Sequence, residues 1–268
     1  MTATFAEENA KHFDKVAPGD WPQWVLDLHQ QILSFLASSD EFAAWAGLPP
    51  APPAGRRMLD YACGDGLITR ALRPLFTSAL GVDVSGAMLD KYRAKASQLG
   101  YVGPQQMVGV RGDFISSEPD RTGTTVTEPQ LPESEIWDFD LVVISMALHH
   151  LEEPDVALRR LAARLKAGGK LLVVDWTPLD GSTLAQRKYQ EELRKDPGRV
   201  ERIAEALQTH AARHTISKPN GFPADEMREL YAQAGCKNMQ WKLAEELSYI
   251  PVLDAKAQLY WSVATKAV

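Results

Sequence analysis

Cysteine is scarce in this sequence: Cys63 and Cys236 are the two examples among 268 residues. Two thiols cannot build a disulfide framework, and by themselves they cannot complete the four-ligand shell of a structural zinc site. We therefore expect no metal centre. The fold must rest on a hydrophobic core instead, and a chain of this length is large enough to bury one.

Long hydrophobic runs are also missing. Runs such as the LVVIS segment from Leu141 are far shorter than the ~18–20 residues of a membrane-spanning helix. The chain opens with Met, Ala and acidic residues, without the basic start and apolar run of a secretory signal. These absences predict a cytoplasmic protein that does not enter a membrane.

An excess of positive charge is absent as well, because 29 Lys and Arg stand against 35 Asp and Glu, a net charge of −6. This balance disfavours nucleic acid and anionic membrane surfaces as general partners. The 45% of hydrophobic and 24% of charged residues are ordinary for a globular protein. The composition leaves the oligomeric state open.

The chain divides into two parts at a proline-rich connector, LPPAPPAG, which spans residues 48–55. Apolar residues recur near a helical period before it, which predicts an N-terminal helical cap over residues 1–47. Residues 55–268 form the second, larger domain.

Short apolar runs alternate with amphipathic segments after the connector, which is typical of a parallel sheet covered by helices on both faces. The expected strands are 57–62, 78–84, 107–114, 140–146 and 170–176, and the expected helices are 67–75, 86–99 and 154–166.

The second half of the chain adds segments around this α/β core. Residues 116–137 are polar and acidic, which predicts a surface insertion. Residues 182–215 form a helical insert that is interrupted at Asp196-Pro197-Gly198, and a further helix is expected over 223–235. The closing runs, 238–249 and 257–265, suit an antiparallel hairpin, which brings the sheet to seven strands.

The turn after the first strand, LDYACGDG from Leu59 to Gly66, is the first candidate site. Small residues there let a ligand approach the backbone, and the next helix points its N-terminal N–H groups at that ligand. The candidate contacts are Asp60, Ala62, Cys63 and Gly64. Taken alone, this turn is also an ordinary structural feature.

Asp83 ends the second strand, 23 positions after Asp60, close to the ~20 expected in a nucleoside-binding unit. Its carboxylate is positioned to accept hydrogen bonds from both ribose hydroxyls. The alternative role is capping of the next helix, which Ser85 can supply instead. Val84 and Met88 complete this group of candidate contacts.

The third strand ends in GDF, where Asp113 can accept the exocyclic amine of adenine and Phe114 can cover the ring. A solvated loop aspartate is the alternative. A dinucleotide enzyme fits less well, because Thr69 stands where its third glycine belongs. The acids of the first turn also suit a nucleoside carrying an ammonium and a sulfonium better than two phosphates.

These motifs resemble those of the class I S-adenosylmethionine-dependent methyltransferases over about residues 58–176 and the closing hairpin. Ala62 replaces the family's first glycine, and Ala167 replaces the proline of its usual Lys-Pro-Gly-Gly turn. The resemblance implies a Rossmann-like, mostly parallel seven-stranded sheet with S-adenosylmethionine as cofactor. Within the family, the chain looks most like quinone-biosynthesis and secondary-metabolite enzymes, which implies a small organic acceptor.

His149 and His150 follow the fourth strand at the edge where such folds bind ligands. Adjacent side chains are expected to diverge, and we favour His150 over His149 as a general base. Helix capping or cofactor contact is the alternative for both. At the same edge, Ser145 is a candidate cofactor contact and Trp176 a candidate wall of the acceptor pocket, although Trp176 suits plain packing equally.

The helical segments supply the remaining candidates. Phe13 and Trp21 are expected to close over the cofactor, because active-site covers exclude water. The other histidines are mostly expected to be solvated or to cap helices, and contact with the substrate is the alternative if their segments cover the site; these are His12, His29, His210 and His214. The alternative function is a catalytically silent S-adenosylmethionine-binding regulatory subunit.

Overall fold

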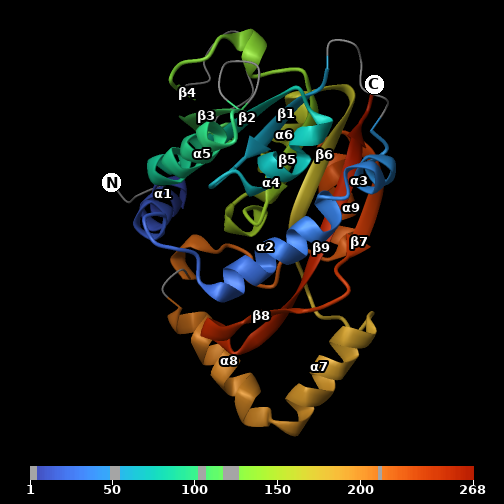
Figure 1. Cartoon of the computed structure of the whole chain (residues 1–268). Coiled ribbons are helices and arrows are strands. Elements are labelled where there is room, and N and C mark those ends of the chain that lie inside the picture. Colours follow the sequence, from blue (N-terminus) through green and yellow to red (C-terminus); the bar gives the residue numbers. More distant parts are fainter. Residues whose placement is uncertain (1–4, 49–54, 102–106, 117–126, 211–212) are drawn as a thin grey trace.

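The computed structural model describes residues 5–48, 55–101, 107–116, 127–210 and 213–268. A single sheet with the strand order β4-β3-β2-β1-β5-β6-β9-β7 runs through the molecule, and β8 pairs with β9 (Figure 1). The strands are β1 (Arg57–Tyr61), β2 (Ser78–Asp83), β3 (Met107–Gly112), β4 (Thr127–Glu128), β5 (Phe139–Ser145), β6 (Leu165–Thr177), β7 (Cys236–Leu243), β8 (Ser248–Ile250) and β9 (Ala255–Lys266).

The strands β3, β2, β1, β5 and β6 are parallel, whereas β9 pairs antiparallel with both β6 and β7. The predicted α/β class, parallel sheet and terminal antiparallel hairpin are therefore confirmed. The strand count differs from seven because β4 and β8 each add a short antiparallel strand at the periphery. The expected strand 238–249 is accordingly split between β7 and β8.

The central strands are buried on both faces, and their side chains alternate between two hydrophobic clusters. In β5, Val142 and Ile144 belong to one cluster, whereas Leu141 and Val143 belong to the other. This alternation follows from the two-residue period of a strand. It explains why the parallel strands are almost continuously apolar in sequence.

Helices cover both faces. The first cluster includes residues of α6 (Pro154–Ala163) and α9 (Ala224–Gln233). The second includes residues of α4 (Leu67–Leu72) and α5 (Gly86–Gln98). The helix expected over 154–166 ends earlier, at Ala163, because the chain joins the sheet as β6 from Leu165.

The N-terminal helices do not form one uniform cap. Leu28, Ile32 and Phe35 of α2 (Gln23–Leu36) and Phe42 of α3 (Ser39–Ala46) belong to the second hydrophobic cluster. The α1 helix (Phe5–Val16) buries Asn9 instead of a row of apolar residues. The α2 and α3 helices are therefore part of the core, and α1 is the covering element. Most of the proline-rich connector, residues 49–54, lies outside the described residues.

The predicted insertion 116–137 is peripheral only in part. Residues 117–126 lie outside the described residues, but Ile136 and Trp137 are buried in the first cluster, which corrects the expectation of an entirely surface segment. Their apolar side chains pack beside the start of β5.

The helical insert contains α7 (Leu184–Lys195) and α8 (Pro197–Thr209), separated at Asp196 as expected. Residues 211–212 of the insert lie outside the described residues. These two helices project from one end of the sheet (Figure 1). Within the described ranges, no helix has the length and apolarity needed to cross a membrane.

Candidate active site

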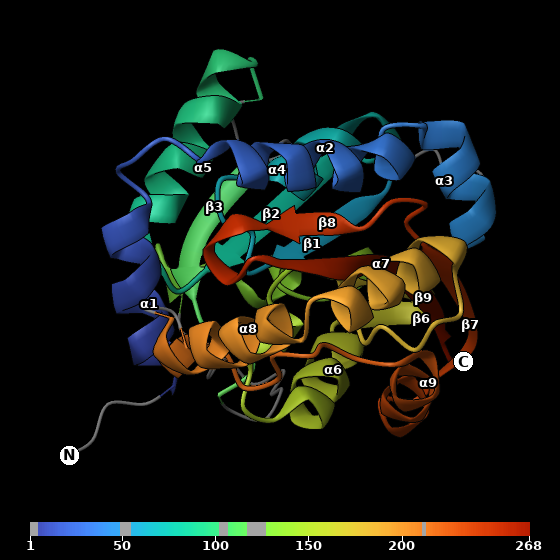
Figure 2. The same ribbon diagram turned by 90° about the horizontal axis from the view of Figure 1, so that it is seen from below.

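A cavity of about 1400 Å³ opens at the carboxyl ends of the parallel strands. The elements α1, α2, α7, α8 and β8 are arranged around this end of the sheet (Figure 2). The volume exceeds the roughly 300–1,000 Å³ of a pocket for a single small ligand. The predicted site residues that line it are Asp60, Ala62, Cys63, Gly64, Asp83, Val84, Met88, Asp113, Ser145, His149, His150, Phe13, Trp21 and Trp176.

The turn after β1 brings backbone close to the cavity. Ala62 has φ of 55° and Gly64 has φ of 52°, so both lie in the left-handed region. A Cβ added to Gly64 would meet no atom within 4 Å, so this glycine leaves open space beside its backbone. Ala62 occupies the position of the family's first glycine, and its positive φ gives the physical reason why glycine suits that place. Beside it, burial raises the pKa of the Cys63 thiol.

Asp60 holds the turn to the next helix. Its Oδ2 accepts hydrogen bonds from the Thr69 backbone N–H at 3.1 Å and from Thr69 Oγ1 at 2.7 Å. Burial raises the pKa of Asp60 to about 7, although the Thr69 hydrogen bonds oppose that rise. From the sequence, Thr69 was considered only as the position where a dinucleotide enzyme has its third glycine. The hydrogen bonds to Asp60, which a hydroxyl side chain in the first turn of a helix can form, were not predicted.

Asp83 joins the ends of β1 and β2. Its Oδ2 accepts the Gly64 N–H at 2.8 Å, and its Oδ1 accepts the Ser85 N–H at 2.8 Å. Each carboxylate oxygen can accept a further hydrogen bond. Ser85 caps α5 by accepting the Met88 N–H at 3.2 Å, as the sequence suggested. Burial raises the pKa of Asp83, and the backbone donors partly offset this.

Asp65, the third acid of the turn, is compensated by the protein itself. Its carboxylate forms ion pairs with Lys95 and with Arg70, and it accepts the Trp21 Nε1–H at 3.2 Å. Burial alone would raise the pKa of Asp65, but the two cations and the Trp21 hydrogen bond outweigh it and lower the pKa. The turn is therefore less acidic toward the cavity than its sequence indicates.

The third-strand motif splits into two roles. Asp113 lines the cavity, and its Oδ1 accepts hydrogen bonds from Tyr61 Oη at 3.0 Å and from the Ile115 N–H at 2.9 Å. Phe114 lies in the core instead, 1% exposed, with the Arg164 guanidinium 3.7 Å from its ring centroid. The expectation that Phe114 covers an adenine is therefore corrected. Ile115 is the apolar residue of this segment that lines the cavity.

The α1 helix is fastened over the site at both ends. Asp14 Oδ1 accepts hydrogen bonds from Ser85 Oγ at 2.6 Å and from the Ala87 N–H at 3.1 Å. Near the other end, Asn9 Nδ2 donates to the His150 carbonyl at 3.4 Å. Phe13 lies edge-on to the His150 ring, with centroids 5.5 Å apart. The helix thus bridges the second and fifth strand ends of the sheet.

His149 and His150 do not diverge as expected. Both lie in the 3₁₀ turn Leu148–His150, and their ring centroids are 4.2 Å apart at an interplanar angle of 40°. Consecutive side chains in a 3₁₀ turn are about 120° apart, whereas those in an extended strand point to opposite faces. Both rings line the cavity.

His149 is bound to a buried carboxylate. Its Nδ1 lies 2.6 Å from Asp175 Oδ1, and its backbone N–H donates to Asp175 Oδ2 at 3.1 Å. Asp175 is 0% exposed and also accepts the Trp176 N–H at 2.7 Å. An ionised carboxylate can only accept hydrogen bonds, so Nδ1 of His149 is the donor. In the neutral ring, Nε2 is then the nitrogen that can accept a proton. Asp175 is a functional candidate that the sequence motifs did not indicate, because its partner His149 comes from a different strand end.

His150 has a different environment. Its Nδ1 lies 2.6 Å from the Thr215 carbonyl, which can only accept, so Nδ1 carries the hydrogen. Burial and then the neighbouring His149 lower the pKa of His150 well below its ordinary value, and the Thr215 hydrogen bond opposes this only in part. The ring is therefore neutral at physiological pH and a weak base.

Three of the remaining histidines also line the cavity, as the alternative of a covering segment allows: His12, His29 and His210. Burial lowers the pKa values of His12 and His29. The rings of His214 and His12 are in edge-to-face contact, with centroids 6.0 Å apart. No sequence signal distinguished these positions, because their exposure depends on how α1, α2 and the helical insert pack.

The fold is that of the Rossmann-like methyltransferases. It is similar to the crystal structure of magnesium protoporphyrin IX methyltransferase from Synechocystis PCC 6803 with bound SAH. The TM-score is 0.57 at 16% identity, over 97% of this chain and 96% of that chain. It is also similar to a putative methyltransferase from Bacillus halodurans, with a TM-score of 0.55 at 16% identity over 88% of this chain and 100% of that chain.

The chain belongs to a family described as "Methyltransferase domain", which matches residues 29–240. It is 32% identical over 142 residues to an uncharacterized methyltransferase of Schizosaccharomyces pombe, covering 53% of this chain and 46% of that protein. It is 27% identical over 175 residues to a ubiquinone/menaquinone biosynthesis C-methyltransferase of Cronobacter sakazakii, covering 60% of this chain and 63% of that protein. Both matches span less than two thirds of the relative's length.

Proposed function

We propose that this protein is an S-adenosylmethionine-dependent methyltransferase that acts on a small organic acceptor. The observation that carries the proposal is a single cavity whose two sides differ. One side has the Gly64 turn and the Asp83 carboxylate, and the other has the His149–Asp175 pair. The cofactor supplies an electrophilic methyl group on a sulfonium when bound.

The cofactor side suits a nucleoside. Asp83 is fixed by two backbone N–H groups and retains acceptor capacity for ribose hydroxyls. Ala62, Cys63 and Gly64 border the same space, and Val84 and Met88 add apolar surface. Phe13, Trp21, Asp60, Asp113 and Ser145 remain proposed cofactor contacts because they line the cavity.

His149 is the better placed general base, which reverses the preference for His150. Asp175 fixes the ring orientation and stabilises the positive charge that the ring gains on accepting a proton. If Nε2 of His149 takes a proton from the methyl acceptor, the reacting oxygen, nitrogen, sulfur or carbon atom of the acceptor becomes more nucleophilic. His150 is proposed to hold the His149 ring in place, since the two rings are in contact. Trp176 is proposed to wall the acceptor side.

Transfer of a labelled methyl group from S-adenosylmethionine to a metabolite extract tests the function directly. We expect label in one class of small molecules, lost in His149→Ala. A silent regulatory subunit would bind S-adenosylhomocysteine yet label nothing from any extract.

Calorimetric titration of Asp83→Ala with S-adenosylhomocysteine tests the cofactor site separately. We expect affinity to fall by about 1.5–3 kcal/mol, the scale of hydrogen bonds to a charged group. Unchanged affinity would mean that the ribose lies elsewhere, and heat of binding from NAD would favour a dinucleotide enzyme.

A further inference from the structure

Two neighbouring segments contribute aliphatic side chains to the lining of the cavity. Ile203 and Leu207 come from α8, and Val252 and Leu253 come from the 3₁₀ turn Pro251–Leu253 between β8 and β9. All four are aliphatic. We call the part of the cavity that these four residues line the distal chamber.

The α8 helix has an unusual relation to the core. None of its residues, Pro197–Thr209, is buried, yet it is amphipathic, and Ile203 and Leu207 are half-buried against the cavity. An amphipathic helix ordinarily buries its apolar stripe against other protein elements. Here the stripe faces the distal chamber, so part of the apolar surface that would stabilise this helix is available to a ligand.

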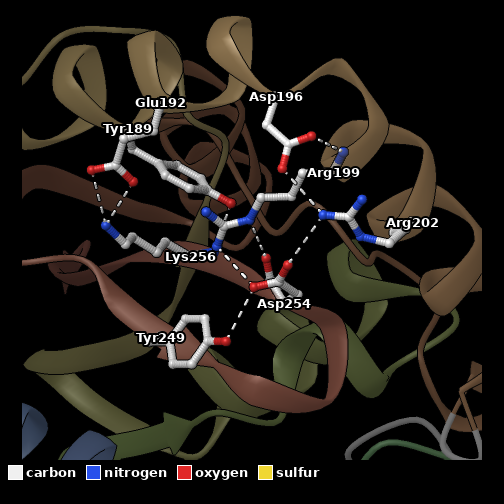
Figure 3. Close-up of polar contacts among 8 residues, drawn as sticks. All are labelled: Tyr189, Glu192, Asp196, Arg199, Arg202, Tyr249, Asp254 and Lys256. Carbon is white, nitrogen blue, oxygen red and sulfur yellow. Dashed lines mark hydrogen bonds and ion pairs between the residues drawn. The ribbon is translucent and has the colours of Figure 1, made fainter.

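A polar network connects α8 to the residue that follows the 3₁₀ turn Pro251–Leu253 (Figure 3). Arg199 Nε donates to the Asp254 carbonyl at 3.0 Å, and its guanidinium pairs with Asp254 Oδ1 at 3.0 Å. Tyr249 Oη donates to the same Asp254 oxygen at 3.1 Å. Asp254 directly follows Leu253, so the contacts between Arg199 and Asp254 tie α8 to the segment that carries Val252 and Leu253.

A second set of contacts extends the network to α7. Tyr189 Oη accepts the Lys256 backbone N–H at 3.1 Å, and Lys256 Nζ pairs with Glu192 at 3.1 Å. The Arg199 guanidinium lies 5.5 Å from the Tyr189 ring centroid. We call these contacts, with those of Asp254, the α7–α8 latch. The four aliphatic side chains that line the chamber take no part in these polar contacts.

We propose that the distal chamber binds the hydrocarbon portion of an elongated, uncharged acceptor whose reacting end lies at His149. This proposal names the substrate class of the proposed methyltransferase and rests on that function. The total cavity is larger than one small ligand needs, and a cofactor at the Gly64 turn would leave the chamber to a second molecule. The aliphatic side chains of Ile203, Leu207, Val252 and Leu253 favour an apolar occupant, and the charge of Lys256, which also lines the cavity, is paired with Glu192.

The test uses the whole protein and a neutral apolar fluorophore, N-phenyl-1-naphthylamine, titrated in saturating S-adenosylhomocysteine. Leu207→Glu is expected to weaken fluorophore binding roughly tenfold or more, because a carboxylate in an apolar chamber is costly to desolvate. Leu207→Met, which conserves apolar volume, is expected to retain binding. Ala204→Glu introduces the same charge at an exposed position of α8 outside the cavity lining and serves as the matched control.

A series of straight-chain alkanols then reports the shape of the site. Longer alkanols should displace the fluorophore from the wild-type protein at lower concentrations than shorter ones do. This dependence on chain length should be lost in Leu207→Glu. No saturable fluorophore binding, or equal loss in Ala204→Glu and Leu207→Glu, would overturn the proposal. The affinity for S-adenosylhomocysteine is measured separately in the wild type and in every variant. If the wild type bound the fluorophore but not S-adenosylhomocysteine, the proposed function would be refuted, whereas the apolar site would stand.

Discussion

The Nδ1 atom of His149 lies 2.6 Å from Oδ1 of Asp175, a carboxylate that the protein buries completely. His149 lies in the 3₁₀ turn that follows β5, and Asp175 lies near the end of the adjacent parallel strand β6, 26 positions later in the sequence. The second oxygen of Asp175 accepts the His149 backbone N–H, so the carboxylate fixes both the ring and the turn that carries it. This is the arrangement that orients a histidine for proton transfer.

If His149 is the base, His149→Ala should lower turnover ~10²–10⁴-fold, and His150→Ala should lower it less. Asp175→Asn should reduce kcat with little change in acceptor KM, because it acts on the ring and not on the acceptor. The double variant of His149→Ala and Asp175→Asn should be no slower than His149→Ala alone, since residues acting as a unit are not additive. Multiplicative losses, or a His150→Ala defect as large as that of His149→Ala, would contradict the assignment.

Ala62→Gly should stabilise the protein by about 1 kcal/mol, because the left-handed conformation at φ of 55° costs an alanine about that much. Urea unfolding monitored by circular dichroism measures the change. Ala71→Gly in α4 is the control and should destabilise, since glycine is unfavourable within a helix. A loss of stability in Ala62→Gly would mean that the turn relaxes when the methyl group is removed.

Asp60 predicts a pH dependence of stability. Burial raises its pKa from 3.8 to about 7, so the folded protein binds this proton more tightly than the unfolded chain does. The resulting stabilisation is present below about pH 4 and is lost as the pH rises through 7. Asp60→Asn stays neutral throughout. It should therefore exceed the wild type in stability at pH 8, on the order of a few kcal/mol, and lose this advantage toward pH 4.

Unfolding free energies of both proteins at pH 4, 6 and 8 give the difference curve directly. A difference that is independent of pH would show that Asp60 does not titrate in this window. Thr69→Val removes the hydroxyl donor that opposes the rise in the Asp60 pKa, so it should shift the pH dependence of stability to higher pH.

The α7–α8 latch should be sensitive to salt. Asp254→Asn keeps a side chain that tolerates the left-handed φ of 48° but removes the charge that pairs with Arg199. We expect faster amide exchange in α8 and unchanged S-adenosylhomocysteine affinity, with less than about 1 kcal/mol lost in global stability because the pair is partly exposed. Molar NaCl should bring the wild type close to the variant.

Asp90→Asn removes an exposed ion pair with Arg93 on α5 and should leave α8 exchange unchanged. Protection of α8 that resists both salt and Asp254→Asn would show that packing, not the latch, holds α8 in position.

The sequence by itself determined the α/β fold and the edge of the sheet at which the candidate site residues gather. Apolar periodicity is a local property, and strands buried on both faces leave nearly unbroken runs such as Leu141 to Ile144. Parallel strands also place their carboxyl ends at one edge, so the positions of Asp60, Asp83 and His149 there followed from the order of elements alone.

Tertiary structure decided what those side chains do. Phe114 turns into the core because Arg164, from another element, packs on its ring. The preference between His149 and His150 depended on Asp175, which lies on a neighbouring strand, and on Thr215, which lies in the insert. Likewise, α2 and α3 joined the core while α8 kept its apolar stripe facing a cavity. These outcomes depend on contacts between residues distant in sequence, and no local pattern of hydrophobicity or spacing encodes such contacts.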